Sequence, residues 1–393
     1  MVGNFHVVVV GGGIGGLCLA QGLKKSGISV DVYERDESAA FRAQGYRISL
    51  KDTGAWALLD CLPESLFELC VATSINTATR LVVLDEHLNQ KFAMPLPHAA
   101  PGIEGFGVNR LTLREILLGG LDGSVHFAKI YERFEQAEDG RVTAQFADGT
   151  SAAADLLVGA DGTWSRVRQQ LAPDAVIDDL GWTIYGKSPI RPDTLEWLPE
   201  PLTDSFNRIS GPGGVGMSVA TCRTRGPVAD AVAKLAPGLS LTEIPGYLSW
   251  TLSGADDRYR SADGPALRDL AAELVLQWHP AVRRIVADAD AAATFPVALT
   301  SAQPVTRRQA SNVTLLGDAI HTMSPGRGEG ANTALADARL LRQALIRVAA
   351  SEVTLAEARD QYETEMLRCG FEAVAKSRDE PFFRRAKART PNT

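Results

Sequence analysis

Six residues near the start of the chain, from Gly11 to Gly16, form a Gly-x-Gly-x-x-Gly pattern between an apolar run and an amphipathic segment. Glycines in this context let the backbone approach a pyrophosphate, and the free N–H groups of the helix that follows carry a partial positive charge. Glu34 ends the next apolar run, where a carboxylate can accept the ribose hydroxyls of an adenosine. An acid there argues against a 2′-phosphate, so we do not expect NADP at this site.

Two later stretches have the composition of nucleotide-binding loops. The middle one runs from Asp155 into Asp161-Gly162, and the late one contains Gly317-Asp318 and then glycines at 326, 328 and 330. Closely spaced glycines let backbone N–H groups crowd a planar ring, and the helix that they open would direct its positive end at that ring. Three stretches in this order predict one large dinucleotide, for which FAD is the best candidate. The alternative, a chance glycine cluster, is disfavoured by the strand, helix and acid that surround it.

The elements that must position these loops follow from hydrophobic periodicity. Residues 5–10 predict a buried parallel strand, 13–26 a helix and 29–33 a second strand, which together form a βαβ unit. Residues 141–146 and 151–157 predict a hairpin that runs into a buried strand, and 312–316 another buried strand.

The stretch from about 174 to 295 differs in character, with most of the tryptophans and with alternating apolar and polar residues. It predicts an antiparallel sheet inserted between the nucleotide-binding segments, to which residues 81–84 and 92–94 add strands. Residues 181–188 match a Walker A pattern, but their β-branched and aromatic interior predicts a strand instead. Near the end, a capping box that starts at Thr354 predicts a long helix. The basic residues of 384–389 are expected to be a solvated end.

With these motifs the chain resembles the class A flavoprotein monooxygenases, the p-hydroxybenzoate hydroxylase-like family. By that resemblance Asp318 would hold a ribityl hydroxyl of FAD, and the backbone from Pro325 to Asn332 would surround the isoalloxazine. The segment that begins at Asp161 is similar to the family's Asp-Gly motif, which is associated with both FAD and NAD(P)H. Arg110 matches an arginine that lies along the FAD, whereas Arg114 is expected to be a surface charge.

The fold class that follows is α/β, α+β overall, with a Rossmann-like FAD-binding domain, an inserted antiparallel β-sheet substrate domain and a long C-terminal helix. We assign residues 1–72, 100–174 and 296–350 to the FAD-binding domain, 73–99 and 175–295 to the substrate-binding domain, and 351–393 to the C-terminal helix and tail. The residues predicted to contact the cofactor are Gly11, Gly13, Ile14, Gly15, Gly16, Glu34, Arg35, Arg47, Arg110, Asp161, Gly317, Asp318, Pro325, Gly328, Gly330, Ala331 and Asn332.

The resemblance implies that NADPH or NADH reduces FAD, and that O₂ then forms a flavin C4a-hydroperoxide that transfers one oxygen atom to an aromatic or polycyclic small molecule. Such a reaction needs no nucleophilic side chain, and no catalytic residue is assigned, in keeping with the lack of a Ser-His-Asp or Cys-His arrangement. The substrate is expected to lie against the inserted sheet, with Tyr185, Met217, Cys222 and Trp250 as candidate contacts. Alternation fixes only which neighbours share a face, so each of the four could instead be a core residue.

Three alternatives differ in chemistry. The first is a related FAD enzyme, such as a halogenase or a prenyl reductase, of which the halogenase is disfavoured because the Trp-x-Trp-x-Ile-Pro motif is absent. A Baeyer–Villiger or epoxidising flavin enzyme remains open, because the same flavin chemistry serves both. A GDP-dissociation-inhibitor-like binding protein shares the fold without using flavin, and it would be colourless when purified.

Composition indicates the class of protein and the partners that it can have. Of the 393 residues, 45% are hydrophobic and 22% charged, values of an ordinary globular protein, and the net charge of −7 gives no reason to expect nucleic acid or an anionic membrane as a partner. Five dispersed cysteines without a C-x-x-C pair suggest reduced thiols and no metal site. We therefore expect a cytoplasmic protein, either a monomer or a homodimer.

Overall fold

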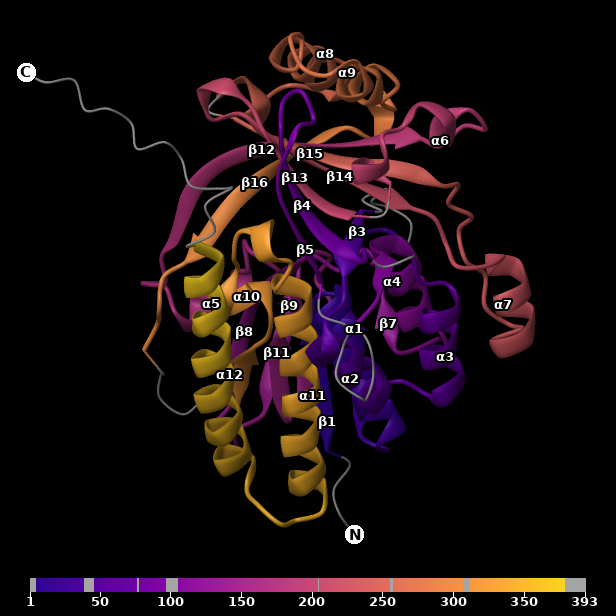
Figure 1. Ribbon diagram of the computed structural model, residues 1–393. Coiled ribbons are helices and arrows are strands. Elements are labelled where there is room, and N and C mark those ends of the chain that lie inside the picture. Colours follow the sequence, from indigo (N-terminus) through magenta and orange to yellow (C-terminus); the bar gives the residue numbers. More distant parts are fainter. Residues whose placement is uncertain are drawn as a thin grey trace, which may run out of the picture.

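The computed structural model describes residues 5–38, 46–75, 78–96, 105–203, 205–254, 257–306 and 312–378 of the chain. Two sheets lie at different levels of the molecule: a five-stranded sheet in the lower part with helices beside it, and a seven-stranded sheet across the upper part (Figure 1). The basic tail at 384–389 lies outside the described residues.

The five-stranded sheet has the order β17-β11-β1-β2-β7, and every pair in it is parallel. Its first strand carries the unbroken valine run Val7–Val10, which is buried because both faces of the sheet are covered. The predicted βαβ unit is confirmed. The strands are β1 (His6–Val10), β2 (Ser29–Tyr33), β7 (Val125–His126), β11 (Leu156–Gly159) and β17 (Val313–Leu315), and the helix between the first two is α1 (Ile14–Lys25).

Two long helices follow the last strand and lie side by side in the lower part of Figure 1. α11 (Gly330–Ala349) packs against α1, and α12 (Leu355–Arg378) packs against α11. The predicted capping box is present, because the Thr354 hydroxyl oxygen accepts from the Glu357 backbone N–H while the Glu357 carboxylate accepts from that of Thr354. Tyr362 donates its hydroxyl to the carbonyl of Leu315 at 2.8 Å, which fixes α12 against β17.

A three-stranded antiparallel sheet, β8 (Tyr131–Gln136), β9 (Val142–Phe146) and β10 (Ser151–Ala154), precedes β11 as the hairpin pattern predicted. A short pair, β3 (Arg47–Ser49) and β6 (Gly107–Asn109), lies between the two large sheets. The shorter helices are α2 (Asp52–Cys61), α3 (Glu64–Ala72), α4 (Arg110–Leu118), α5 (Arg166–Leu171), α6 (Thr194–Trp197), α7 (Val228–Leu235) and α10 (Asp318–His321).

The seven-stranded sheet has the order β16-β12-β15-β14-β13-β4-β5, and only its β13–β4 pair is parallel. The inserted antiparallel sheet is therefore confirmed, with one parallel pair in it. Residues 181–188 lie within β12, as the strand prediction requires. The strands are β4 (Arg80–Asp85), β5 (Gln90–Pro95), β12 (Ile177–Pro189), β13 (Ser205–Ser210), β14 (Gly216–Cys222), β15 (Tyr247–Ser253) and β16 (Phe295–Ala302).

Two segments cross the predicted domain boundaries. β16 was assigned to the nucleotide domain from residue 296 onward, but it pairs with β12 from Phe295 to Ala302. α7 comes from the inserted part, yet it packs against α3 of the FAD-binding part. Local periodicity could not reveal either contact, because both depend on partners that are distant in the sequence.

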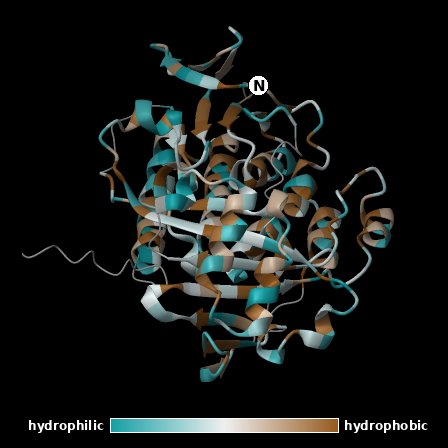
Figure 2. Ribbon diagram, turned by 90° about the horizontal axis from the view of Figure 1, so that it is seen from above, coloured by the Kyte–Doolittle hydropathy of each residue, from teal (hydrophilic) through white to brown (hydrophobic). Residues whose placement is uncertain are grey.

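One face of the seven-stranded sheet forms a separate apolar core beneath α8 (Gly264–Leu274) and α9 (Pro280–Ala287). Trp250 is almost completely buried in it, and its indole N–H donates to the Ser188 hydroxyl at 3.1 Å. A Cβ on Gly186, the residue opposite Trp250 on β12, would lie 2.1 Å from the ring, so only glycine fits there. Seen from above, hydrophobic and hydrophilic residues alternate along these strands (Figure 2), as a sheet with two different faces requires.

No helix in the described ranges is long and apolar enough to cross a membrane. Over the same ranges, no three His, Cys, Asp or Glu side chains come together as metal ligands would.

Replacing Trp250 with alanine should lower the free energy of unfolding by about 3–5 kcal/mol, because a cavity would open in the core under α8 and α9. FAD content should not change, since this core lies on the face of the sheet that is turned away from the nucleotide loops. Urea denaturation and the flavin-to-protein absorbance ratio measure the two quantities. The Ser218→Ala variant changes the opposite face of β14 and serves as the control; equal stability of the two variants would contradict this assignment of faces.

Candidate cofactor and substrate site

The glycine turn between β1 and α1 brings the chain very close to the end of β11. Gly11 has φ +112°, and a Cβ there would lie 2.3 Å from the carbonyl oxygen of Ala160, so no other residue fits. A Cβ on Gly13 would meet no atom within 4 Å. Gly13 also precedes α1, and no side chain caps that helix. The turn therefore leaves open space in front of uncapped N–H groups, as a pyrophosphate site needs.

Glu34 lies in a buried charged cluster beside this turn. Its carboxylate accepts the backbone N–H groups of Gly12 at 2.6 Å and of Asp36 at 2.9 Å. Each carboxylate oxygen can accept a second hydrogen bond, so the ribose hydroxyls predicted for this position still have acceptors.

Arg114 corrects the sequence analysis, which expected a surface charge. Its side chain is 4% exposed and donates through Nε to the carbonyl of Gly12 at 3.0 Å, and its guanidinium lies 3.6 Å from Glu34 and 3.5 Å from Asp36. Two acids and a carbonyl at one buried corner require a cation, and α4 supplies it. The signal in the sequence was the position of Arg114 among Leu113, Ile116 and Leu117 on the apolar helix.

The late motif is fixed by a buried histidine pair. Gly317 has φ +64° and donates its N–H to the Asp337 carboxylate at 3.0 Å, and the same oxygen lies 2.6 Å from His321 Nε2. Burial alone would lower the pKa of His321, but Asp337 and Asp318 outweigh it and the pKa is raised. His321 thus joins α10 and α11 through a polar contact and also packs against Gly370 of α12.

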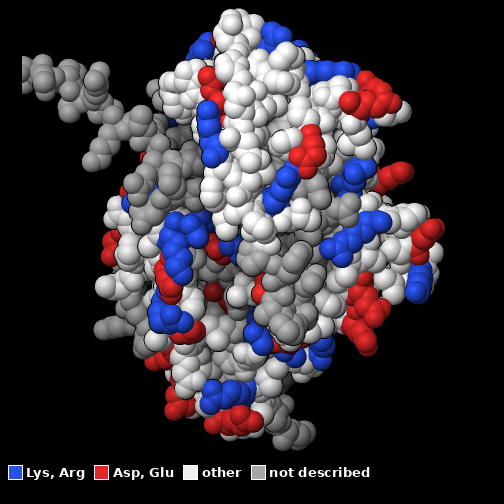
Figure 3. Space-filling view, viewed as in Figure 1, with Lys and Arg blue, Asp and Glu red and all other residues white. Residues whose placement is uncertain are grey.

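Asp318 begins α10 and is exposed to solvent, although protein atoms lie densely around its carboxyl group, as expected of a residue that lines a recess. Burial raises the pKa of Asp318, and Arg110 and His321 act in the opposite direction. In Figure 3 the surface is hollowed at mid-height, with acidic atoms at depth, between the part that carries the upper sheet and the part below.

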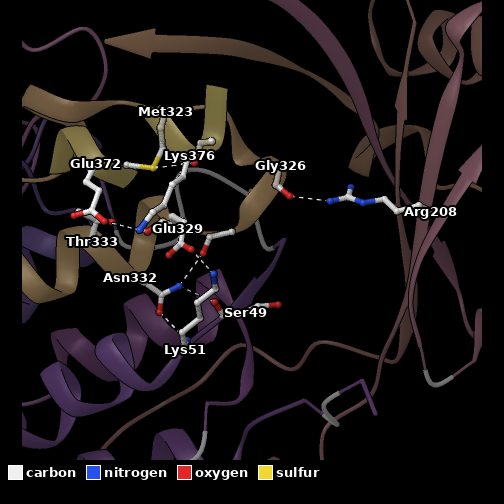
Figure 4. Close-up of polar contacts among 12 residues, drawn as sticks. Ser49, Lys51, Arg208, Met323, Gly326, Glu329, Asn332, Thr333, Glu372 and Lys376 are labelled. Carbon is white, nitrogen blue, oxygen red and sulfur yellow. Dashed lines mark hydrogen bonds and ion pairs between the residues drawn. The ribbon is translucent and has the colours of Figure 1, made fainter. Parts of the chain in front are cut away.

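The loop from Pro325 to Asn332 is held from several sides (Figure 4). The Asn332 amide donates to the carbonyls of Ser49 and Gly328 at 2.9 and 2.8 Å and accepts the Lys51 backbone N–H at 2.7 Å. Its side chain therefore fixes the loop shape, and a contact of Asn332 with FAD would have to come from its backbone. α11 begins at Gly330 without a side-chain cap, so the N–H groups of its first turn remain available.

The middle motif has a structural role, because it caps a helix and ties it to α10. The Asp161 carboxylate accepts the Ser165 hydroxyl and the backbone N–H groups of Arg166 and Val167, and so it caps α5. Arg168 is buried and donates to the carbonyls of Ala319 and Thr163, both at 2.8 Å, which ties this motif to α10. The cofactor contact expected of Asp161 stays a prediction.

Three arginines predicted to contact the cofactor differ in position. Arg110 begins α4 with its guanidinium 5.6 Å from the centre of the Tyr46 ring, and its charge acts on Asp318, which places it by the groove. Arg47 lies on β3 and faces the seven-stranded sheet near Cys222. Arg35 is exposed after Glu34.

The four candidate substrate contacts divide between the two faces of the seven-stranded sheet. Met217 and Trp250 are buried in the core beneath α8 and α9, so the prediction for these two is corrected. Tyr185 and Cys222 lie on the other face, toward the nucleotide-binding part, where they stay candidates. Registered residues of paired strands share a face, which extends this second face to Arg208 on β13.

Aromatic rings and long polar side chains cover that face. Tyr185 stacks on Phe295 at 5.1 Å and meets Tyr46 edge-on at 6.0 Å. The Tyr247 hydroxyl accepts from the Asn109 amide at 3.1 Å, which links β15 to the start of α4. Arg208 reaches across to donate to the carbonyl of Gly326, at 2.8 Å, in the loop shown in Figure 4. This face is the wall opposite the predicted flavin loop.

These features fit FAD. The groove has an open glycine turn and an acid at one end, and Asp318 and the uncapped start of α11 at the other. Both helix starts would supply N–H donors to the cofactor, and Glu34 and Asp318 would accept its hydroxyls. Residues that sequence reasoning did not select but that build the site are Asp337, Arg168 and Arg208.

Comparisons with known proteins agree with this fold and site. A family model described as FAD binding domain matches residues 255–377, and one described as NAD(P)-binding Rossmann-like domain matches residues 9–68. The crystal structure of a Photorhabdus luminescens protein, assigned as an FAD-containing monooxygenase, is similar to this chain with a TM-score of 0.85 and 31% identity, over 97% of this chain and 98% of that one.

Curated relatives are similar over most of this chain. The dual O-methyltransferase/FAD-dependent monooxygenase CTB3 of Cercospora beticola is 32% identical over 86% of this chain but only 42% of its own length. The FAD-dependent monooxygenase thnD of Trichoderma harzianum is 28% identical over 95% of this chain and 92% of its own length. The chain thus spans less than half the length of the dual-function relatives.

Asp318→Ala should weaken FAD binding by about 1.5–3 kcal/mol, the usual value for a lost hydrogen bond to a charged group. The flavin-to-protein absorbance ratio after gel filtration, and a titration of the apoprotein with FAD, measure the loss. Asp178→Ala removes a surface acid that pairs with Arg378 and should bind FAD normally. Unchanged FAD affinity in Asp318→Ala would show that the late motif is wrongly assigned.

The His321–Asp337 pair should make stability depend on pH. Because the pKa of His321 is raised in the fold, its charged ring stabilises the protein fully below its ordinary pKa of about 6.5. That contribution is lost as pH rises through the folded-state pKa. As the pH rises above about 6.5, the melting temperature should therefore decrease less in His321→Gln than in the unmodified protein. His126→Gln, at a half-exposed histidine, is the control; the same pH profile in His321→Gln and the unmodified protein would refute the role of the pair.

Proposed function

The chain belongs to the family of FAD-dependent monooxygenases, and on this premise we propose that it inserts one oxygen atom of O₂ into an aromatic or polycyclic small molecule, with NADPH or NADH as the reductant. One observation carries the choice of substrate class. An aromatic face of the seven-stranded sheet, with Tyr185 stacked on Phe295, lies opposite the loop expected to hold the flavin. A planar molecule could bind between the two.

The bound FAD would supply the oxygen chemistry. The protein would hold the substrate near the flavin and shield the flavin from water. Arg208 bridges the sheet and the carbonyl of Gly326, so it keeps the wall at a fixed separation from the loop. The half-buried side chains around it limit the access of water, which protects reactive oxygen species from side reactions. No side chain has to act as a nucleophile in this scheme.

Direct reduction by a nicotinamide is proposed from the segment Asp161 to Arg168, which resembles the family's Asp-Gly motif. The family match at residues 9–68 covers the turn and acid that we assign to the adenosine of FAD, so it does not locate a second nucleotide. The methyltransferase named in the dual-function relatives is not extended to this chain, because it spans less than half of their length.

The test is a screen of phenols, quinones and polyketide compounds with the FAD-loaded protein. We expect at least one compound to stimulate NAD(P)H oxidation and to gain the mass of one oxygen atom, with the label retained from ¹⁸O₂. Mass-spectrometric fragmentation of the product distinguishes hydroxylation from Baeyer–Villiger insertion next to a carbonyl and from epoxidation. A protein that takes up no FAD would instead be a binding protein of the same fold, and NAD(P)H oxidation without oxygen in any product would contradict the monooxygenase assignment.

A further inference from the structure

Two buried donors between β3 and the seven-stranded sheet lack acceptors. The Tyr185 hydroxyl and Nε of Arg47 are both inaccessible to solvent, and neither makes a hydrogen bond of normal geometry with the described residues, although the Ser249 and Tyr247 side chains lie near the Tyr185 hydroxyl. Tyr185 is only 7% exposed. Buried donors in proteins are almost always paired, so two unpaired ones at the same place indicate a missing acceptor.

The two donors lie at one corner of the aromatic wall. Arg47 is registered with Asn109 in the β3–β6 pair, and registered residues point to the same side. The Asn109 amide donates to the Tyr247 hydroxyl, so Arg47 is on the side that faces the sheet. Burial raises the pKa of the Cys222 thiol, and the charge of Arg47 opposes that rise, as expected of a guanidinium close to Cys222. Tyr185 is on the same face of the sheet as Cys222 and Tyr247.

A second cation shares this corner. The Lys187 ammonium lies 4.8 Å from the centre of the Tyr247 ring, and no hydrogen bond or ion pair joins it to the described residues. Burial lowers the pKa of Lys187, while Cys222 and Asp290 act in the other direction. One Asp290 carboxylate oxygen already accepts the backbone N–H of Ala292 at 2.9 Å. The corner therefore presents two cations and a hydroxyl, without a carboxylate bonded to any of them in the described part of the chain.

On the basis of the proposed function, we propose that Arg47, Lys187 and Tyr185 together bind an anionic oxygen of the aromatic substrate. Arg47 then serves the substrate and not FAD. Hydrogen bonds from charged donors to an oxyanion are stronger than neutral ones, and more so in a buried place. Burial also raises the pKa of Tyr185, so its hydroxyl stays protonated and can donate. An oxygen held at this corner would orient the ring system along the stacked Tyr185 and Phe295.

The anionic oxygen could belong to an ionised phenol or enol, or to a carboxylate, and matched probes distinguish these sources. Flavin difference spectra of the FAD-loaded protein would give the affinity for 2-hydroxy-1,4-naphthoquinone and its methyl ether, and for 2-naphthoate and its methyl ester. We expect the ionised member of at least one pair to bind about tenfold or more tightly than its methylated partner. The pair that shows the preference identifies the oxygen. Equal affinities within both pairs, or no binding of any probe, would overturn the proposal.

Variants test the three residues separately. Arg47→Gln, Lys187→Met and Tyr185→Phe should each reduce the preference for the ionised probe, by about tenfold for the two cations, and leave the affinity for the methylated probe unchanged. Arg47→Lys should keep part of the preference. Met217→Leu changes the opposite face of the sheet and is the matched control.

The outcomes separate this proposal from the proposed function. If Arg47→Gln lost FAD while all three variants kept the probe preference, Arg47 would be a cofactor contact, as first predicted, and the proposal would be overturned. Probe binding needs no turnover, so a protein that prefers ionised probes but transfers no oxygen would contradict the monooxygenase assignment alone. A protein that oxygenates substrates without any such preference would contradict the anionic-oxygen site alone.

Discussion

Two helix starts without caps are the constraint on which the site depends. α1 and α11 pack together, and each begins at a glycine turn where no side chain accepts its first N–H groups. Free N–H groups at a helix start bind acceptors readily, and an elongated dinucleotide could supply acceptors at both places. The tight turn at Gly11, the Arg114 cluster and the Asp337–His321 pair all hold the backbone that carries these two starts. A change in any of these supports should therefore act on the cofactor groove.

Much of the fold and of the cofactor groove could be predicted, because the motifs there are local. The turn after β1, the acid at Glu34 and the glycines of the late loop each impose their geometry within a few residues. Arg114 and Arg168 were harder to place, since their partners come from segments that are distant in the sequence. A charged residue on an apolar helix can be a surface charge or a member of a buried ion pair, and the two cannot be distinguished until its acidic partners are known.

The substrate wall shows where alternation stops being informative. Met217 and Cys222 are five residues apart on one strand, so they must face opposite sides, and they could never have lined the same site. Alternation alone left undecided which of the two faces the flavin loop. The pairing of the strands and the helices α8 and α9 decide it, because those helices cover the Met217 side, so that the Cys222 side faces the nucleotide-binding part.

Polar side chains join that face to the nucleotide-binding part, beside the edge contact of Tyr185 with Tyr46 and a small apolar cluster of Ile75, Cys222 and Tyr247. Arg208 donates to the carbonyl of Gly326 in the flavin loop, and Asn109 at the start of α4 donates to Tyr247, while Arg47 and Lys187 form no ion pair with the described residues. Polar bridges of this kind hold two walls apart, whereas apolar contact would close the space between them. The separation of the sheet face from the flavin loop thus suits a planar substrate. The positive charge of Arg47 and Lys187 at one corner would fix the orientation of that substrate. A wall built only from aromatic residues would bind planar molecules but could not select which carbon atom faces the flavin.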